Sequence, residues 1–150
     1  MKFKIVEEVK KVKPEDFRIR KYKFRPDGTL DVFESVNLEE MDLTELPFNF
    51  GKIFGNFDCW ENNLTSLKGA PEEVNGWFDC DNNNLTSLKY CPKIVKRYFS
   101  CSYNDLENLK YLNLNGISGE IYVINNPDLK LTEKEQLWAT LNPGRLILEI

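Results

Sequence analysis

The fold of this chain is decided by FDCWENNLTSL at residues 57–67, which recurs as FDCDNNNLTSL at 78–88 and as FSCSYNDLENL at 99–109. Each row begins 21 residues after the previous one, and the segments between rows keep this spacing, with Pro71 and Pro92 in equivalent places. A fixed period of about 20 to 50 residues is typical of solenoids, in which each repeat forms one coil and neighbouring coils stack.

Each repeat has the form F-x-C-x-x-N-x-L-x-x-L. The Phe and Cys are two residues apart, which is strand spacing, so both side chains face the interior. The Asn leaves the strand, and its amide can bond the backbone of a tight turn. The following Leu residues fill the coil, and the prolines argue against a long helix on the return side. The residues that define the repeat are Phe57, Cys59, Asn62, Phe78, Cys80, Asn83, Phe99, Cys101 and Asn104.

The pattern extends beyond these rows. One period earlier, Val36 and Leu38 take the Phe and Cys positions, and Met41 takes the place of Asn. On the other side, Ile121 and Val123 follow after 22 residues. We therefore expect a mostly β, right-handed solenoid of five coils with one parallel sheet and degraded end repeats, which face water. The expected organisation is one domain, with an N-terminal cap at 1–34, the solenoid at 35–131 and a C-terminal cap at 132–150.

Both caps have sequence signals. Residues 22–24 and 30–32 flank Pro26-Asp27-Gly28 and predict a β-hairpin, because Asp-Gly tolerates the positive φ of a tight turn. Thr132 and Glu135 predict a capping box that opens a helix reaching about residue 141. Residues 145–150 are strand-like, and residues 1–13 are compatible with either a helix or a strand.

Composition points to one soluble domain. The chain has 150 residues, of which 41% are hydrophobic and 29% charged. It has no apolar run of about 18 residues and its start lacks the apolar core of a signal peptide, so we expect a cytoplasmic protein that does not enter membranes. Residues 1–25 hold ten Lys/Arg and four Asp/Glu, a net +6, whereas residues 26–150 hold ten and twenty, a net −10.

The rows resemble a leucine-rich repeat, L-x-x-L-x-L-x-x-N-x-L, with Phe and Cys in two Leu positions, and the short period with LTSL…P resembles the short bacterial subtype. DGTLDV at 27–32, LTELPFNFGK at 43–52 and GNFDC at 55–59 resemble leucine-rich-repeat proteins of large tailed bacteriophages, over roughly residues 22–129. The resemblance implies the α/β solenoid class and a habit of binding proteins. For a phage protein it also implies a host partner in the bacterial cytoplasm.

The cysteines and asparagines favour structural roles. A column of Cys invites a metal site, but the chain has no Cys-x-x-Cys pair and no His, and free Cys packs as a small hydrophobe. A disulfide between neighbouring strands is geometrically open but disfavoured in the cytosol. Cys91, on the return side, is also expected to be structural. The Asn column, which continues to Asn126, satisfies turn backbone, so we predict neither a metal nor a cofactor.

The alternate strand positions predict an interaction face. Strand parity turns four aromatic and four acidic side chains outward: Asp58, Trp60, Trp77, Asp79, Asp81, Tyr98, Glu120 and Tyr122. Large aromatics in water indicate an interface, here with a protein that carries a basic patch; alternatively they stack on one another, shield the sheet or meet the caps. Asp79 and Asp81 could do acid–base work, but without a His, a nucleophile motif or a phosphate loop we predict no catalytic residue, no enzyme and no small-molecule substrate.

The N-terminal basic segment offers an alternative function. Basic strips with aromatics bind nucleic acid, and this one has Phe17, Arg18, Arg20, Lys21, Tyr22, Lys23, Phe24 and Arg25. Strand parity places Tyr22 and Phe24 on one face and the cations at 21, 23 and 25 on the other, which favours a solvated cap.

Overall fold

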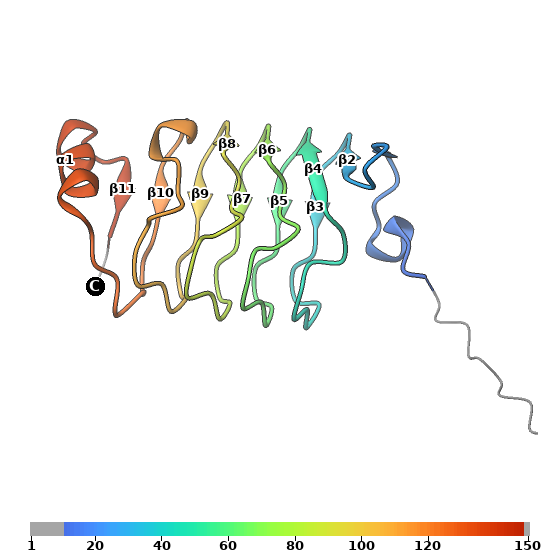
Figure 1. Cartoon of the computed structure of the whole chain (residues 1–150), viewed down its shortest axis with the longest axis horizontal. Helices are drawn as coiled ribbons and strands as arrows, with labels where there is room; N and C mark the ends of the chain where they lie inside the picture. The colour runs from blue at the N-terminus through green and yellow to red at the C-terminus, as the bar shows by residue number, and fades with distance from the viewer. Residues whose placement is uncertain (1–10, 149–150) are drawn as a thin grey trace, which may run out of the picture.

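The computed structural model describes residues 11–148, which form mostly short strands in parallel sheets with one short α-helix (Figure 1). In chain order the elements are η1 (Pro14–Phe17), β1 (Tyr22–Phe24), β2 (Leu30–Val32), β3 (Val36–Asn37), β4 (Phe50–Ile53), β5 (Phe57–Asp58), β6 (Glu73–Val74), β7 (Phe78–Asp79), β8 (Ile94–Val95), β9 (Phe99–Ser100), η2 (Leu114–Gly116), β10 (Ile121–Tyr122), α1 (Glu133–Leu141) and β11 (Leu146–Ile147).

The strands form two sheets, so the prediction of one parallel sheet is wrong. The six-stranded sheet has the order β11-β10-β9-β7-β5-β3, and a five-stranded sheet on the return side has the order β1-β2-β4-β6-β8. The second sheet escapes sequence analysis because β6 and β8 are two residues long and bury only Val74 and Val95, too little to show alternation. Pro71 and Pro92 precede these strands and leave them intact.

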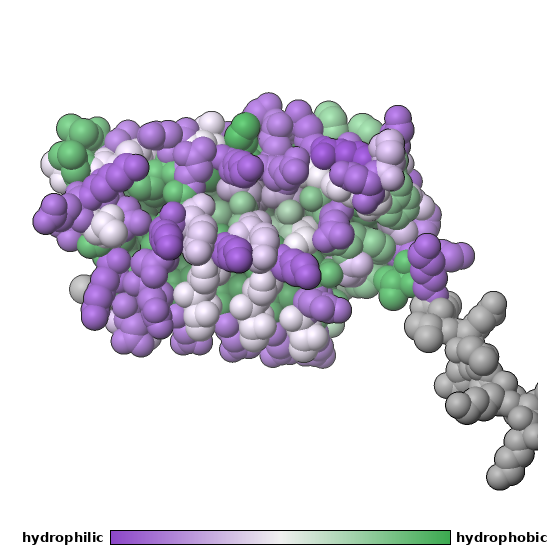
Figure 2. Space-filling model, in the orientation of Figure 1, coloured by the Kyte–Doolittle hydropathy of each residue, from purple (hydrophilic) through white to green (hydrophobic). Residues whose placement is uncertain are grey.

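The register places equivalent residues side by side. Phe57 pairs with Phe78 and Phe78 with Phe99, each 21 residues further along. Their buried rings form a stacked column with centroids 5.5 and 5.2 Å apart. The Cys that follows each Phe is also fully buried and free, which confirms that these positions fill the core. In Figure 2, polar residues (purple) cover much of the visible face and apolar residues (green) show between them.

The Asn column is a structural ladder, as predicted. The Asn83 amide nitrogen donates to the carbonyls of Cys59 and Cys80, at 3.0 and 3.2 Å, and its Oδ1 accepts from the backbone N–H of Leu64 at 3.0 Å. Asn62 likewise accepts from the N–H of Met41, whose own side chain cannot supply an amide. The ladder therefore joins each repeat to the preceding one at the turn that follows the strand.

The ends match the predicted elements. β1 and β2 form the antiparallel hairpin, with Gly28 at φ 85° in its loop. The capping box is present: Glu135 N–H donates to Thr132 Oγ1 at 3.3 Å, and Thr132 N–H donates to Glu135 Oε2 at 2.7 Å. After α1 the chain returns as β11, which pairs in parallel with β10. The predictions for residues 1–10 and 149–150 lie outside the described residues.

Candidate functional site

Three of the predicted aromatics form a continuous row on the outer side of the six-stranded sheet. This aromatic row consists of Trp77, Tyr98 and Tyr122. The rings of Trp77 and Tyr98 stack at 5.4 Å with 6° between their planes, and Tyr98 meets Tyr122 edge-on at 5.9 Å. All three are half-buried. They therefore stack on one another, as the alternative interpretation expected, and still keep part of their surface in solvent.

Two of the other five predicted outward residues, Trp60 and Glu120, are separate from this row. Pairing of Asp58 with Asp79 places Trp60 opposite Asp81 on the neighbouring strand, and Trp60 is half-buried without an aromatic partner among residues 11–148. Glu120 is exposed and lies beside Tyr98, because Ile121 pairs with Phe99. The sheet therefore brings the predicted residues onto one face, in aromatic and acidic groups that adjoin.

Three half-buried carboxylates make up the carboxylate cluster: Asp58, Asp79 and Asp81. One Oδ1 accepts a hydrogen bond in each case. For Asp79 the donor is the N–H of Asp81 at 2.9 Å, and for Asp58 it is the N–H of Trp60 at 3.0 Å. Within residues 11–148, no Lys or Arg nitrogen lies within 4.0 Å of the three carboxylates. The cluster therefore concentrates negative charge without a cation.

Burial and mutual repulsion change how these carboxyls titrate. Burial, with the charge of Asp81 added to it, raises the pKa of Asp79 to about 7. Burial also raises the pKa of Asp58, against the hydrogen bond from the Trp60 N–H, and the pKa of Asp81. Burial together with the charge of Asp79 raises the pKa of Tyr98 to about 12, so this hydroxyl stays protonated. Each shift disfavours a charged form on this face.

Two further contributors, Ser100 and Ser102, occupy outward strand positions in the sequence pattern but are not among the predicted binding residues. They are only 4% and 2% exposed, although strand parity turns them outward. The hydroxyl of Ser100 and the N–H of Ser102 both donate to Oδ1 of Asp81 at 2.6 Å. The available signal is positional: they occupy the places of Asp79 and Asp81 one repeat later, where a small hydroxyl can reach back to a carboxylate.

The buried environment of the cysteine column makes its thiols unreactive. Burial raises the pKa of Cys59, Cys80 and Cys101 well above the usual range, so each is a neutral thiol, which is a weak nucleophile and a poor metal ligand. The Cys80 thiol donates to the Ser100 carbonyl at 3.3 Å. Across residues 11–148, no group of three His, Cys, Asp or Glu side chains is placed to hold a metal ion.

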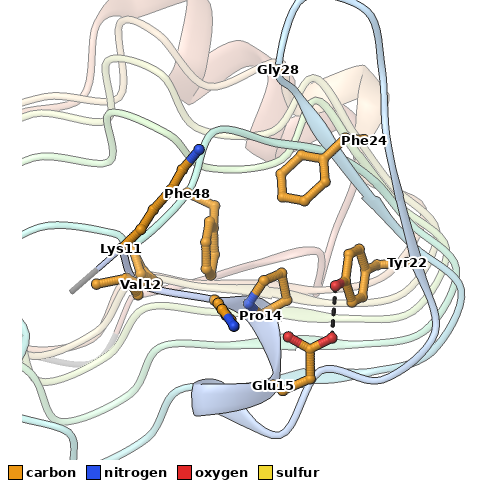
Figure 3. A pocket seen from close by; sticks show the side chains of 10 residues that line it. Lys11, Val12, Pro14, Glu15, Tyr22, Phe24, Gly28 and Phe48 are labelled. Atoms are coloured by element: carbon orange, nitrogen blue, oxygen red, sulfur yellow. Dashed lines mark hydrogen bonds between the residues drawn. The ribbon is translucent and has the colours of Figure 1, made fainter.

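Some side chains of the basic N-terminal segment already have partners within this chain. Arg25 forms an ion pair with Asp31 at 2.8 Å, which raises the pKa of Arg25. The Tyr22 hydroxyl donates to Glu15 at 2.7 Å, as Figure 3 shows. The Tyr22 and Phe24 rings meet edge-on at 5.6 Å, and Phe24 is 48% exposed. These side chains border an open depression of about 970 Å³ between η1 and the hairpin.

Comparisons with known proteins give no further information on function. No family model matches the chain, and neither does any curated protein or solved structure. None of the described helices combines the length and apolar character needed to cross a membrane. The geometry of the side chains is therefore what indicates a function.

Proposed function

We propose that this protein is a leucine-rich-repeat-like solenoid of five coils that binds a partner protein, without catalysis, through the outer face of its six-stranded sheet. The observation that carries the proposal is the aromatic row beside three half-buried carboxylates that lack a cation among the described residues. Half-exposed Trp and Tyr side chains are typical anchors of protein interfaces, where they bury large areas at a small cost in entropy.

The carboxylate cluster specifies the partner's chemistry. Each Asp has lost part of its hydration, as the raised pKa of Asp79, Asp58 and Asp81 reflects. The N–H and hydroxyl groups that donate to these carboxylates supply hydrogen bonds but no attraction from an opposite charge. A Lys or Arg from a partner would restore that attraction in a partly dry site. A partner with a basic patch beside an apolar pocket therefore fits this face, and its charge would also accelerate association.

The resemblance of the repeat rows to phage-borne leucine-rich-repeat proteins supports a host protein as this partner, met in the bacterial cytoplasm. This step is an analogy between families, and the chemistry of the face is independent of it.

The test is affinity capture from bacterial lysate, followed by measurement of the affinity of each captured protein for the wild type and for variants. We expect Trp77→Ala to weaken binding and Asp58→Lys with Asp79→Lys to slow association, whereas Arg18→Glu with Arg20→Glu and Lys23→Glu leaves binding unchanged. If the N-terminal reversals abolish capture and nuclease treatment does the same, nucleic-acid binding by that segment replaces this proposal.

A further inference from the structure

A second charged surface lies around β8, the last strand of the five-stranded sheet. The stretch KYCPKIVKR at 89–97 contains this strand and holds four cations and no acidic residue. All four of these cations are exposed: Lys89, Lys93, Lys96 and Arg97. Beyond β8, the described residues continue the ladder as an isolated bridge between Val95 and Ile117, with backbone hydrogen bonds from Ser118 and Gly119 beside it. The cations therefore follow one sheet edge, in a chain whose overall charge is −4.

Two exposed tyrosines accompany these cations. Tyr90 is 50% and Tyr111 is 47% exposed, and they occupy equivalent places 21 residues apart. Each has the preceding lysine near its ring, with Nζ of Lys89 and of Lys110 at 5.0 and 5.4 Å from the respective centroids. In the part of the chain that the structure describes, neither ring stacks on another aromatic ring. About half of each tyrosine thus remains available to a ligand.

The nearby acids neutralise little of this charge. Glu73 forms ion pairs with Lys52 at 3.0 Å and Lys96 at 3.4 Å, and Glu72 forms an ion pair with Arg25 at 3.5 Å. For the other four cations of the surface, no described carboxylate lies within 4.0 Å: Lys89, Lys93, Arg97 and Lys110. We call these four cations, with Tyr90 and Tyr111, the basic strip.

We propose that the basic strip binds single-stranded nucleic acid. Lys and Arg side chains along one edge attract the phosphate backbone, and exposed rings offer surfaces on which unpaired bases stack. An acidic peptide would use the cations and leave the rings unused, and a duplex keeps the faces of its bases stacked inside. The strip shares no residue with the aromatic row, the carboxylate cluster or the N-terminal basic segment, so this activity is independent of protein binding.

The test is fluorescence anisotropy with a labelled oligothymidylate of about 20 nucleotides, titrated with full-length protein at several salt concentrations. Tyr90→Ala with Tyr111→Ala should weaken binding about tenfold or more, since stacking is lost. Lys89→Glu with Lys93→Glu and Lys110→Glu should weaken it further and flatten the salt dependence, by about 0.7 in log–log slope for each phosphate contact removed. The matched control is Arg20→Glu with Lys21→Glu and Lys23→Glu, which makes the same charge change in the N-terminal cap and should preserve most of the affinity.

Three results would overturn the proposal. The first is no binding by folded wild-type protein at about 50 mM salt, where phosphate contacts are strong. The second is an equal loss in the control, which would place binding elsewhere or make it diffuse. The third is full affinity in the double tyrosine variant with equal competition by polyglutamate or anionic vesicles, which would define a general polyanion surface. Thermal unfolding of each variant checks that the fold is intact, and capture of the protein partner should be unaffected by all of them.

Discussion

Replacing Asp79 by Asn should make the protein more stable and should weaken binding of the proposed partner. The pKa of Asp79 is raised from 3.8 to about 7 because burial and the charge of Asp81 disfavour its carboxylate. Below about pH 4 the carboxyl is protonated in both the folded and the unfolded chain. Between about pH 4 and 7 the unfolded chain loses this proton first, so the stability of the folded protein falls as pH rises and reaches its lower level above pH 7. Asn is neutral throughout and its Oδ1 can still accept from the Asp81 N–H.

The size of the effect follows from the shift. About three pKa units correspond to an upper limit of about 4 kcal/mol, and partial exposure with solvent screening reduces this to about 1–2 kcal/mol. Urea unfolding should therefore show that Asp79→Asn stabilises the protein by this amount at about pH 8 and by little at about pH 4. The exposed Asp105→Asn is the control at both pH values. Equal stabilisation at both pH values, or none at about pH 8, would refute the argument that the Asp79 charge is the source.

The remaining predictions test the row, the ladder and the core. Trp77→Ala should weaken binding of the proposed protein partner by about 2 kcal/mol, measured by calorimetry, and should change the free energy of unfolding by less. Undiminished affinity would show that the aromatic row only shields the sheet. Asn83→Ala should lower stability by about 1–3 kcal/mol in urea unfolding, because buried carbonyls and the Leu64 N–H lose their partner, and an unchanged midpoint would contradict the ladder. Cys80→Val should cost less than about 1.5 kcal/mol, whereas Cys80→Asp should prevent folding of the middle repeats because it buries a charge; circular dichroism distinguishes these outcomes.

The sequence predicts the parts of this fold that repeat. A 21-residue period requires that Phe57, Phe78 and Phe99 lie side by side, and the same spacing predicts the Asn ladder without further information. Short strands such as β6 are different, because one buried Val gives no periodic signal in the sequence. β6 forms because its backbone pairs with the backbone of β4 in the preceding repeat. The hairpin and the capping box are local, so turn chemistry and spacing were enough to locate them.

Strand parity also identified the outward face, but the contacts on it depend on side-chain conformation. It could not show that the Trp77 ring lies flat on Tyr98 while Tyr122 meets Tyr98 edge-on. Nor could it show that Ser100 is buried and that its hydroxyl donates a hydrogen bond to Asp81. These features arise between repeats, where side chains of different size adjoin, and no single repeat encodes them.

The same register has opposite consequences inside and outside the sheet. Inside, it places Phe on Phe and each Asn amide against the backbone of the preceding repeat, and both arrangements stabilise the stack. Outside, it places Asp58 beside Asp79, which is unfavourable. Burial and the charge of Asp81 are the main causes of the raised pKa of Asp79, and the charge of Asp58 adds a smaller contribution. The position does not require an acid, because the next repeat fills it with Ser100 and pairs in the same register. Among the described contacts, the carboxylates of Asp58 and Asp79 accept from the N–H two residues further on, within their own repeat, so these two acids do not hold the repeats together. The proposed cationic partner would make their charges favourable.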